Sequence, residues 1–65
     1  MKFGNNLRAL RTKRGISQEH LAESADLHKN MVGLLERGRR NPSLVTITKL
    51  AKALKVKPAK FFAKF

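Results

Sequence analysis

The apolar residues of this chain recur at steps of three and four, which is the spacing of one face of an α-helix. The clearest series follows Ser43 and consists of Leu44, Ile47, Leu50, Ala51 and Leu54. No stretch alternates apolar and polar residues for more than a few positions, so nothing favours a β-strand. The pattern therefore predicts an all-α fold.

Residues that start or stop helices divide the chain into five expected helices. The expected starts are Asn5 or Asn6, Ser17, a position near His28, Ser43 and Pro58. The expected stops are Gly15, Asp26 and Gly38. We expect Asp26 in the left-handed conformation, which Asp tolerates better than most residues other than Gly. The second and third helices are then joined by a turn of about three residues, as in a helix-turn-helix.

The small size of the chain limits the kinds of site that it can hold. Its 65 residues form one expected domain, residues 1–65. The absence of Cys excludes a disulfide framework and a thiolate zinc site. His20 and His28 have no acidic companions at metal-ligand spacing and no nucleophile, so we expect no metal, no cofactor and no enzyme activity. Without a second domain, we also expect no small-molecule ligand.

The chain carries a formal net charge of +11, from 15 Lys and Arg against 4 Asp and Glu. Such a surface favours an anionic partner, which is nucleic acid or an anionic membrane. No apolar run approaches the roughly 20 residues of a membrane span. The N-terminal residues also lack the apolar core of a signal peptide. We therefore expect a soluble cytoplasmic protein with a nucleic-acid partner and no membrane partner.

Two segments carry a resemblance to a known family. They are LRALRTKRGISQEHLA, residues 7–22, and LERGRRNPS, residues 35–43. Both resemble the Cro/repressor-type helix-turn-helix family, which includes phage repressors, Cro proteins, restriction–modification controller proteins and some antitoxins. The resemblance extends over about residues 4–62. It implies a five-helix, lambda-repressor-like domain in which the second and third helices form the helix-turn-helix.

The resemblance implies that the third helix lies in the major groove of DNA. It assigns DNA contacts to Gln18, His28, Lys29, Asn30, Gly33 and Leu34. The chemistry of Lys29 and Asn30 suits guanine and adenine respectively. Gly33 could allow a close approach to DNA or have no special role, and Leu34 could meet a thymine methyl group or pack against protein. A phosphate contact is one expectation for His28, and a solvated loop residue is the other.

Four polar residues directly after the third helix are expected to contact phosphates and fix the register of the protein on DNA. They are Arg37, Arg39, Arg40 and Asn41. Arg11 and Glu36 occupy positions that form a buried ion pair in some relatives. The alternative is an exposed pair worth under about 1 kcal/mol.

All four acidic residues fall between Glu19 and Glu36, in the same window as Lys29 and Asn30. We expect Glu19, Glu23 and Asp26 to face away from DNA, where they balance charge without repelling phosphate. On this hypothesis the acids and Lys29 lie on different surfaces.

The C-terminal segment mixes lysines with Phe61, Phe62 and Phe65. We expect Phe61 or Phe62 in the core and Phe65 nearer a dimer interface, because exposed apolar patches mark interfaces. A homodimer with two-fold symmetry would hold two third helices about 34 Å apart, one turn of DNA.

The sequence therefore predicts a sequence-specific regulator of transcription, a repressor or controller that binds double-stranded DNA as a homodimer. Two alternatives stay open. One is an antitoxin-like protein-interaction module that also binds DNA. The other is a non-specific DNA-binding protein, which the charge of +11 and the apolar positions on the third helix favour.

Overall fold

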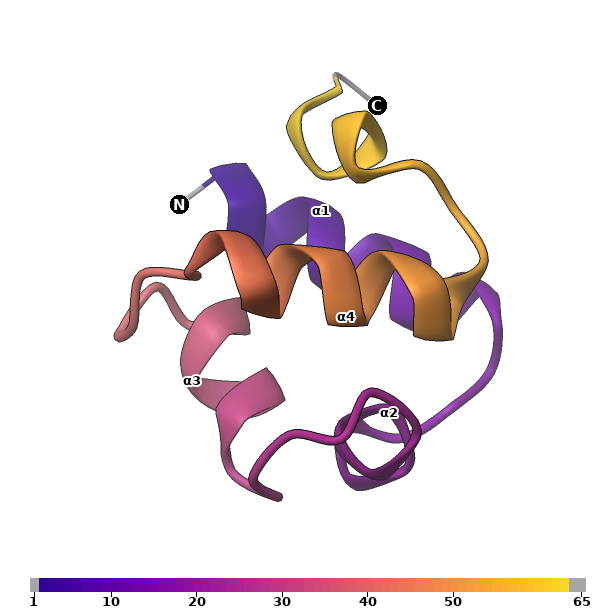
Figure 1. Ribbon diagram of the computed structural model, residues 1–65, viewed down its shortest axis with the longest axis vertical. Helices are drawn as coiled ribbons and strands as arrows, with labels where there is room; N and C mark the ends of the chain where they lie inside the picture. Colours follow the sequence, from indigo (N-terminus) through magenta and orange to yellow (C-terminus); the bar gives the residue numbers. More distant parts are fainter. Residues whose placement is uncertain (1, 64–65) are drawn as a thin grey trace.

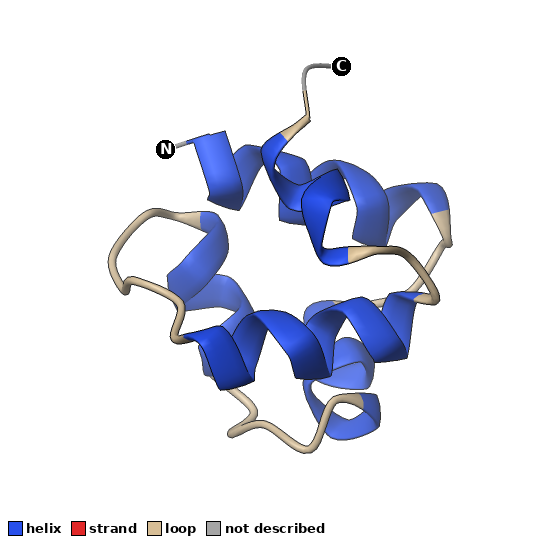
Figure 2. Ribbon diagram, turned by 45° about the horizontal axis from the view of Figure 1, so that its top comes forward, coloured by secondary structure: helices blue, strands red, loops and turns tan. Residues whose placement is uncertain are grey.

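The computed structural model describes residues 2–63 and is made of helices (Figure 1). The elements are α1 (Lys2–Lys13), α2 (Gln18–Ser24), α3 (Met31–Glu36), α4 (Leu44–Leu54) and the 3₁₀-helix η1 (Pro58–Phe62). Figure 2 shows no strand among the described residues. The all-α prediction is therefore confirmed, and no helix in residues 2–63 is both long and apolar enough to cross a membrane.

The fifth expected helix is a single 3₁₀ segment, so the structure contains four α-helices among the described residues. Pro58 occupies its first turn, as the sequence predicts. The N–H of Lys60 donates to the carbonyl of Lys57 at 2.9 Å, the short-range bond of a 3₁₀-helix.

The core lies where α1, α2, α3, α4 and η1 converge. Its fully buried large side chains are Leu7, Leu21, Val32, Leu35, Leu50, Leu54 and Phe61. The Phe61 ring lies 5.2 Å from the Phe3 ring between centroids, in a tilted arrangement. Phe62 is 54% exposed, and Phe65 lies outside the described residues. Phe61 is therefore the core aromatic of this segment.

The contact between α1 and α3 requires a glycine. A Cβ on Gly4 would lie 2.5 Å from the carbonyl oxygen of Leu35 and 2.7 Å from that of Glu36. Both atoms belong to the backbone and cannot rotate away. The backbones of α1 and α3 therefore approach each other at Gly4 more closely than any side chain would allow.

Neither Asn5 nor Asn6 caps the first helix, because α1 begins at Lys2. Asn6 is buried on the same face as Leu7 and Phe3. Its Nδ2 donates to the carbonyls of Phe61 and Ala63, each at 2.7 Å. A buried amide needs such partners, and the C-terminal segment supplies them.

The other boundary predictions agree better with the structure. The Ser17 hydroxyl accepts from the N–H of His20 and caps α2. The Ser43 hydroxyl accepts from the N–H of Thr46 and caps α4. Asp26 has a φ of 56°, so its predicted left-handed conformation is confirmed.

Two expectations about helices α3 and α4 are wrong. Helix α3 begins at Met31, so His28, Lys29 and Asn30 lie in the turn before it. Leu44 was expected on the buried face of α4 and is 80% exposed. It is the first residue of α4, and the buried residues of that helix begin at Leu50.

Candidate nucleic-acid interface

An open hollow of about 540 Å³ lies between the start of α2 and the outer side of α3. It is lined by Ser17, Gln18, Glu19, Lys29, Asn30, Gly33, Leu34 and Arg37. Six of the residues that were expected to contact DNA therefore surround one concave surface. Sequence reasoning gave no DNA role to Ser17 or Glu19, although Ser17 was recognised as the cap that starts α2.

A buried carboxylate connects the hollow to the core. Glu36 is 8% exposed and forms an ion pair with Arg11, whose Nε donates to its Oε2 at 2.6 Å. Arg11 Nη2 and Gln18 Nε2 both donate to Oε1, at 3.1 and 3.0 Å. Arg11 also donates from Nη1 to the carbonyl of Ile16 at 2.8 Å. This network fixes the start of α2 against the end of α3.

Gly33 is buried beneath side chains of the protein itself. A Cβ at this position would lie 3.1 Å from Arg37 Nη1 and 3.1 Å from Gln18 Oε1. The missing side chain of Gly33 therefore leaves room for Gln18 and Arg37. Neither expectation for Gly33, a close approach of α3 to DNA or no special role, included these two neighbours.

Lys29 and Asn30 are exposed in the turn that precedes α3. The Nδ1 atom of His28 accepts from the backbone N–H of Asn30 at 3.2 Å, which orders this turn. His28 is exposed and lies outside the lining of the hollow. Leu34 is half-buried and belongs to the lining. Lys29 and Asn30 thus extend the cationic and polar surface beyond the short helix itself.

The loop after α3 carries Arg39, Arg40 and Asn41, which are all exposed. Gly38 has a φ of 71° and turns the chain out of the helix. The N–H of Arg39 then donates to the carbonyl of Leu34 at 2.9 Å. These three side chains are therefore next to the hollow along the chain but do not line it.

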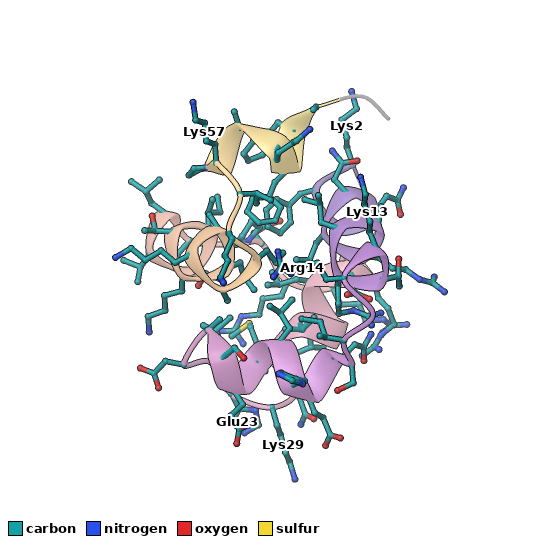
Figure 3. The ribbon with its side chains drawn as sticks, turned by 90° about the vertical axis from the view of Figure 1, so that its right-hand side faces the viewer. Lys2, Lys13, Arg14, Glu23, Lys29 and Lys57 are labelled. Atoms are coloured by element: carbon teal, nitrogen blue, oxygen red, sulfur yellow. The ribbon has the colours of Figure 1, made fainter. Side chains whose placement is uncertain are left out.

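The acidic residues do not lie on a separate surface, so the hypothesis of segregated charge is wrong. A second hollow is lined by Glu19, His20, Glu23, Asp26, Leu27 and Lys29. Figure 3 shows Glu23 and Lys29 at the same end of the molecule. Because residues 25–30 form a turn instead of the first turn of α3, Lys29 lies beside the acids of α2. Lys29 therefore lines one hollow with the expected DNA contacts and a second one with the acids of α2.

Lys49 of α4 contacts the same turn. Its Nζ donates to the carbonyl of Asp26 at 3.3 Å and lies 3.9 Å from the Asp26 carboxylate. The carboxylate is almost fully exposed, so this ion pair is weak. Other contacts of this turn are the bond from the N–H of Leu27 to the carbonyl of Ala22 at 2.8 Å and the packing of the Leu27 side chain against the core.

Comparison with known proteins gives a consistent result. A family described as helix-turn-helix matches residues 7–61. The control protein C.BamHI of Bacillus amyloliquefaciens is 47% identical over 57 residues, which are 86% of this chain and 70% of the relative. The solved restriction-modification controller protein C.AhdI from Aeromonas hydrophila has a TM-score of 0.91 and 54% identity, and the match covers 94% of this chain and 92% of that one.

A further solved relative is the P22 c2 repressor, whose structure contains a synthetic operator. It has a TM-score of 0.86 and 26% identity, over 94% of this chain and 92% of the repressor chain. Taken with the geometry above, these matches establish that the chain belongs to the helix-turn-helix family of DNA-binding transcriptional regulators, whose members are not enzymes.

Proposed function

We propose that this protein is a sequence-specific repressor or controller of transcription that binds double-stranded DNA as a homodimer. The observation that carries the proposal is the hollow beside α3, around which Gln18, Lys29, Asn30 and Arg37 converge. These side chains offer donors and acceptors to base edges in a major groove. The likeness to C.BamHI, C.AhdI and the P22 repressor supports the same function. Such a regulator acts in the cytoplasm, together with the DNA.

The exposed loop after α3 supplies the phosphate contacts in this proposal. Arg39, Arg40 and Asn41 follow Gly38 directly, and the two arginines have no ion-pair partner among the described residues. Their contacts would fix register without reading sequence. If a dimer neutralises roughly 6–8 phosphates, the slope of log affinity against log salt is about −5 to −7.

A homodimer also needs a surface on which two strongly cationic chains can meet. Residues 41–48 form a stretch of eight residues without a charged side chain, in a chain of net charge +11. Within it Leu44 is 80% exposed and Val45 is 63% exposed. Apolar exposure without like-charge repulsion favours this first turn of α4 as the contact between protomers.

Binding-site selection from a random duplex pool, followed by mobility-shift titration, tests the function. A regulator selects one sequence with two-fold symmetry and binds it at least about a thousand-fold more tightly than random DNA. Equal affinity for all duplexes would instead identify a non-specific DNA-binding protein. Stable co-purification with a protein partner that masks the DNA site would favour the antitoxin-like alternative.

The dimer is tested separately by sedimentation of the protein with Leu44→Glu and Val45→Glu. Carboxylates in an apolar contact lose their water without gaining partners, so the double variant should sediment as a monomer. Lys52→Glu is the matched control, because Lys52 is an exposed residue later in α4. If the double variant remains dimeric, the dimer interface lies on another surface of the protein.

A further inference from the structure

Two side chains from separate helices lie over Gly33. Gln18 is the first residue of α2, and Arg37 is the residue that ends α3. The Gln18 Oε1 and the Arg37 Nη1 each lie 3.1 Å from the point where a Cβ on Gly33 would stand. The Arg37 guanidinium thus lies over the middle of α3, whereas Arg39 and Arg40 stay outside the hollow.

The orientation of the Gln18 amide follows from its buried partner. Its Nε2 lies 3.0 Å from Glu36 Oε1, and a carboxylate of this kind only accepts hydrogen bonds. The amino group must therefore face Glu36, which leaves Oε1 over Gly33 as an acceptor. The guanidinium of Arg37 only donates. The outer side of α3 consequently presents a fixed acceptor next to a donor.

This pairing is complementary to one edge of a base pair. In the major groove guanine offers the acceptors N7 and O6, and its paired cytosine offers the N4 amine as a donor. An arginine that donates twice to guanine is the commonest specific contact in protein–DNA complexes. A phosphate contact, in contrast, would need Arg37 at the rim of the hollow, beside Arg39 and Arg40.

We propose that Arg37 reads the guanine of a G·C base pair, that Gln18 accepts from the paired cytosine, and that Gly33 provides the space for both side chains. The inference rests on the proposed function, since α3 must enter the major groove. It assigns to Arg37 a base-reading role in place of the phosphate contact expected from its position after the helix.

The experiment starts from the duplex selected by the wild-type protein. The guanines of each half-site are replaced one at a time by 7-deazaguanine, which lacks the N7 acceptor. At one position we expect the wild-type protein to lose about 10-fold in affinity, within the discrimination that a bidentate contact provides. Arg37→Gln should bind the unmodified duplex more weakly and should show no further loss with 7-deazaguanine at that position.

Arg40→Gln is the matched control, because Arg40 is an exposed arginine outside the hollow. It should weaken binding to all duplexes alike, reduce the salt slope by about one, and keep the full 7-deazaguanine effect. If Arg37→Gln behaves in the same way as Arg40→Gln, Arg37 contacts phosphate and the proposal is wrong, while the proposed function stands. If the wild-type protein selects no sequence, both fail.

Gly33→Ala tests the space above the helix. The neighbours of the new methyl group are the ends of flexible side chains, so the variant should fold, which circular dichroism can verify. Because the methyl group displaces Gln18 and Arg37, selection with Gly33→Ala should yield a different base pair at the position that Arg37 reads. An unchanged preference at that position would show that Gly33 has no part in recognition.

Discussion

Gly4 and Gly33 are both buried glycines within helices, and they differ in what surrounds them. Gly4 of α1 faces the carbonyl oxygens of Leu35 and Glu36 at 2.5 and 2.7 Å from its missing Cβ. Gly33 of α3 faces the side-chain ends of Gln18 and Arg37. The first contact joins two backbones and cannot adjust, whereas the second can. The α1–α3 contact therefore allows no side chain at position 4, whereas the side chains on the outer side of α3 can adjust.

The largest change in the free energy of unfolding is expected when the buried ion pair between Arg11 and Glu36 is broken. Glu36→Leu leaves Arg11 and the Gln18 amide without their acceptor, and breaking a buried pair costs about 3–5 kcal/mol. Urea denaturation followed by circular dichroism measures the free energy of unfolding. The double variant Arg11→Met, Glu36→Leu should recover much of the loss. Purely additive losses would mean that the two charges are not coupled.

A smaller decrease in the free energy of unfolding is expected for Gly4→Ala. The new methyl group would overlap two backbone oxygens, and such overpacking costs about 1–3 kcal/mol even after the better helix propensity of Ala. The same denaturation experiment measures it. A variant as stable as the wild-type protein would mean that α1 and α3 can move apart freely, which would remove the contrast with Gly33.

Gly33→Ala should change stability in the opposite direction. Ala is favoured over Gly in a helix interior by up to about 1 kcal/mol, and the ends of Gln18 and Arg37 need to shift by only a few tenths of an ångström, so Gln18 keeps its bond to Glu36. We expect a gain of about 0.5–1 kcal/mol in the free energy of unfolding. A loss as large as that of Gly4→Ala would show that the two sides of α3 are equally rigid.

The smallest effect is expected for Lys49→Gln. The ion pair with Asp26 is long and its carboxylate is exposed, so its removal should cost under about 0.5 kcal/mol. Denaturation at low and high salt measures this difference. A loss above 1 kcal/mol that disappears at high salt would mean that Lys49 holds the turn between α2 and α3 more firmly than its exposure indicates.

Local signals in the sequence predicted most of the fold. Ser17 and Ser43 were recognised as caps because their hydroxyls suit helix starts, and Asp26 as a left-handed break. The apolar spacing after Ser43 identified Leu50, Ala51 and Leu54, the buried residues of α4. Each of these features depends on neighbours within about one helical turn, which a single sequence contains.

Features that depend on distant residues could not be predicted in the same way. The role of Gly4 arises from α3, more than thirty positions away, and Asn6 was taken for a cap because its partners lie near residue 63. The place of Lys29 beside Glu23 depends on where α3 begins, and helix ends are weakly encoded. For the candidate site, the family pattern indicated which positions belong to it. That the side chains of Gln18 and Arg37 both lie over Gly33 could be seen only in the three-dimensional structure.

The amide of Asn6 has a consequence for how the molecule opens. Its two donors hold the backbone of residues 61 and 63 across 55 and 57 positions of the chain. A contact between residues so far apart closes a long loop, and this costs more conformational entropy than the contact between α2 and α3, which are neighbours in the chain. Amide protons around η1 should consequently exchange with solvent sooner than those of α3, so local opening would begin between η1 and α1 and leave the packing of α2 against α3 intact.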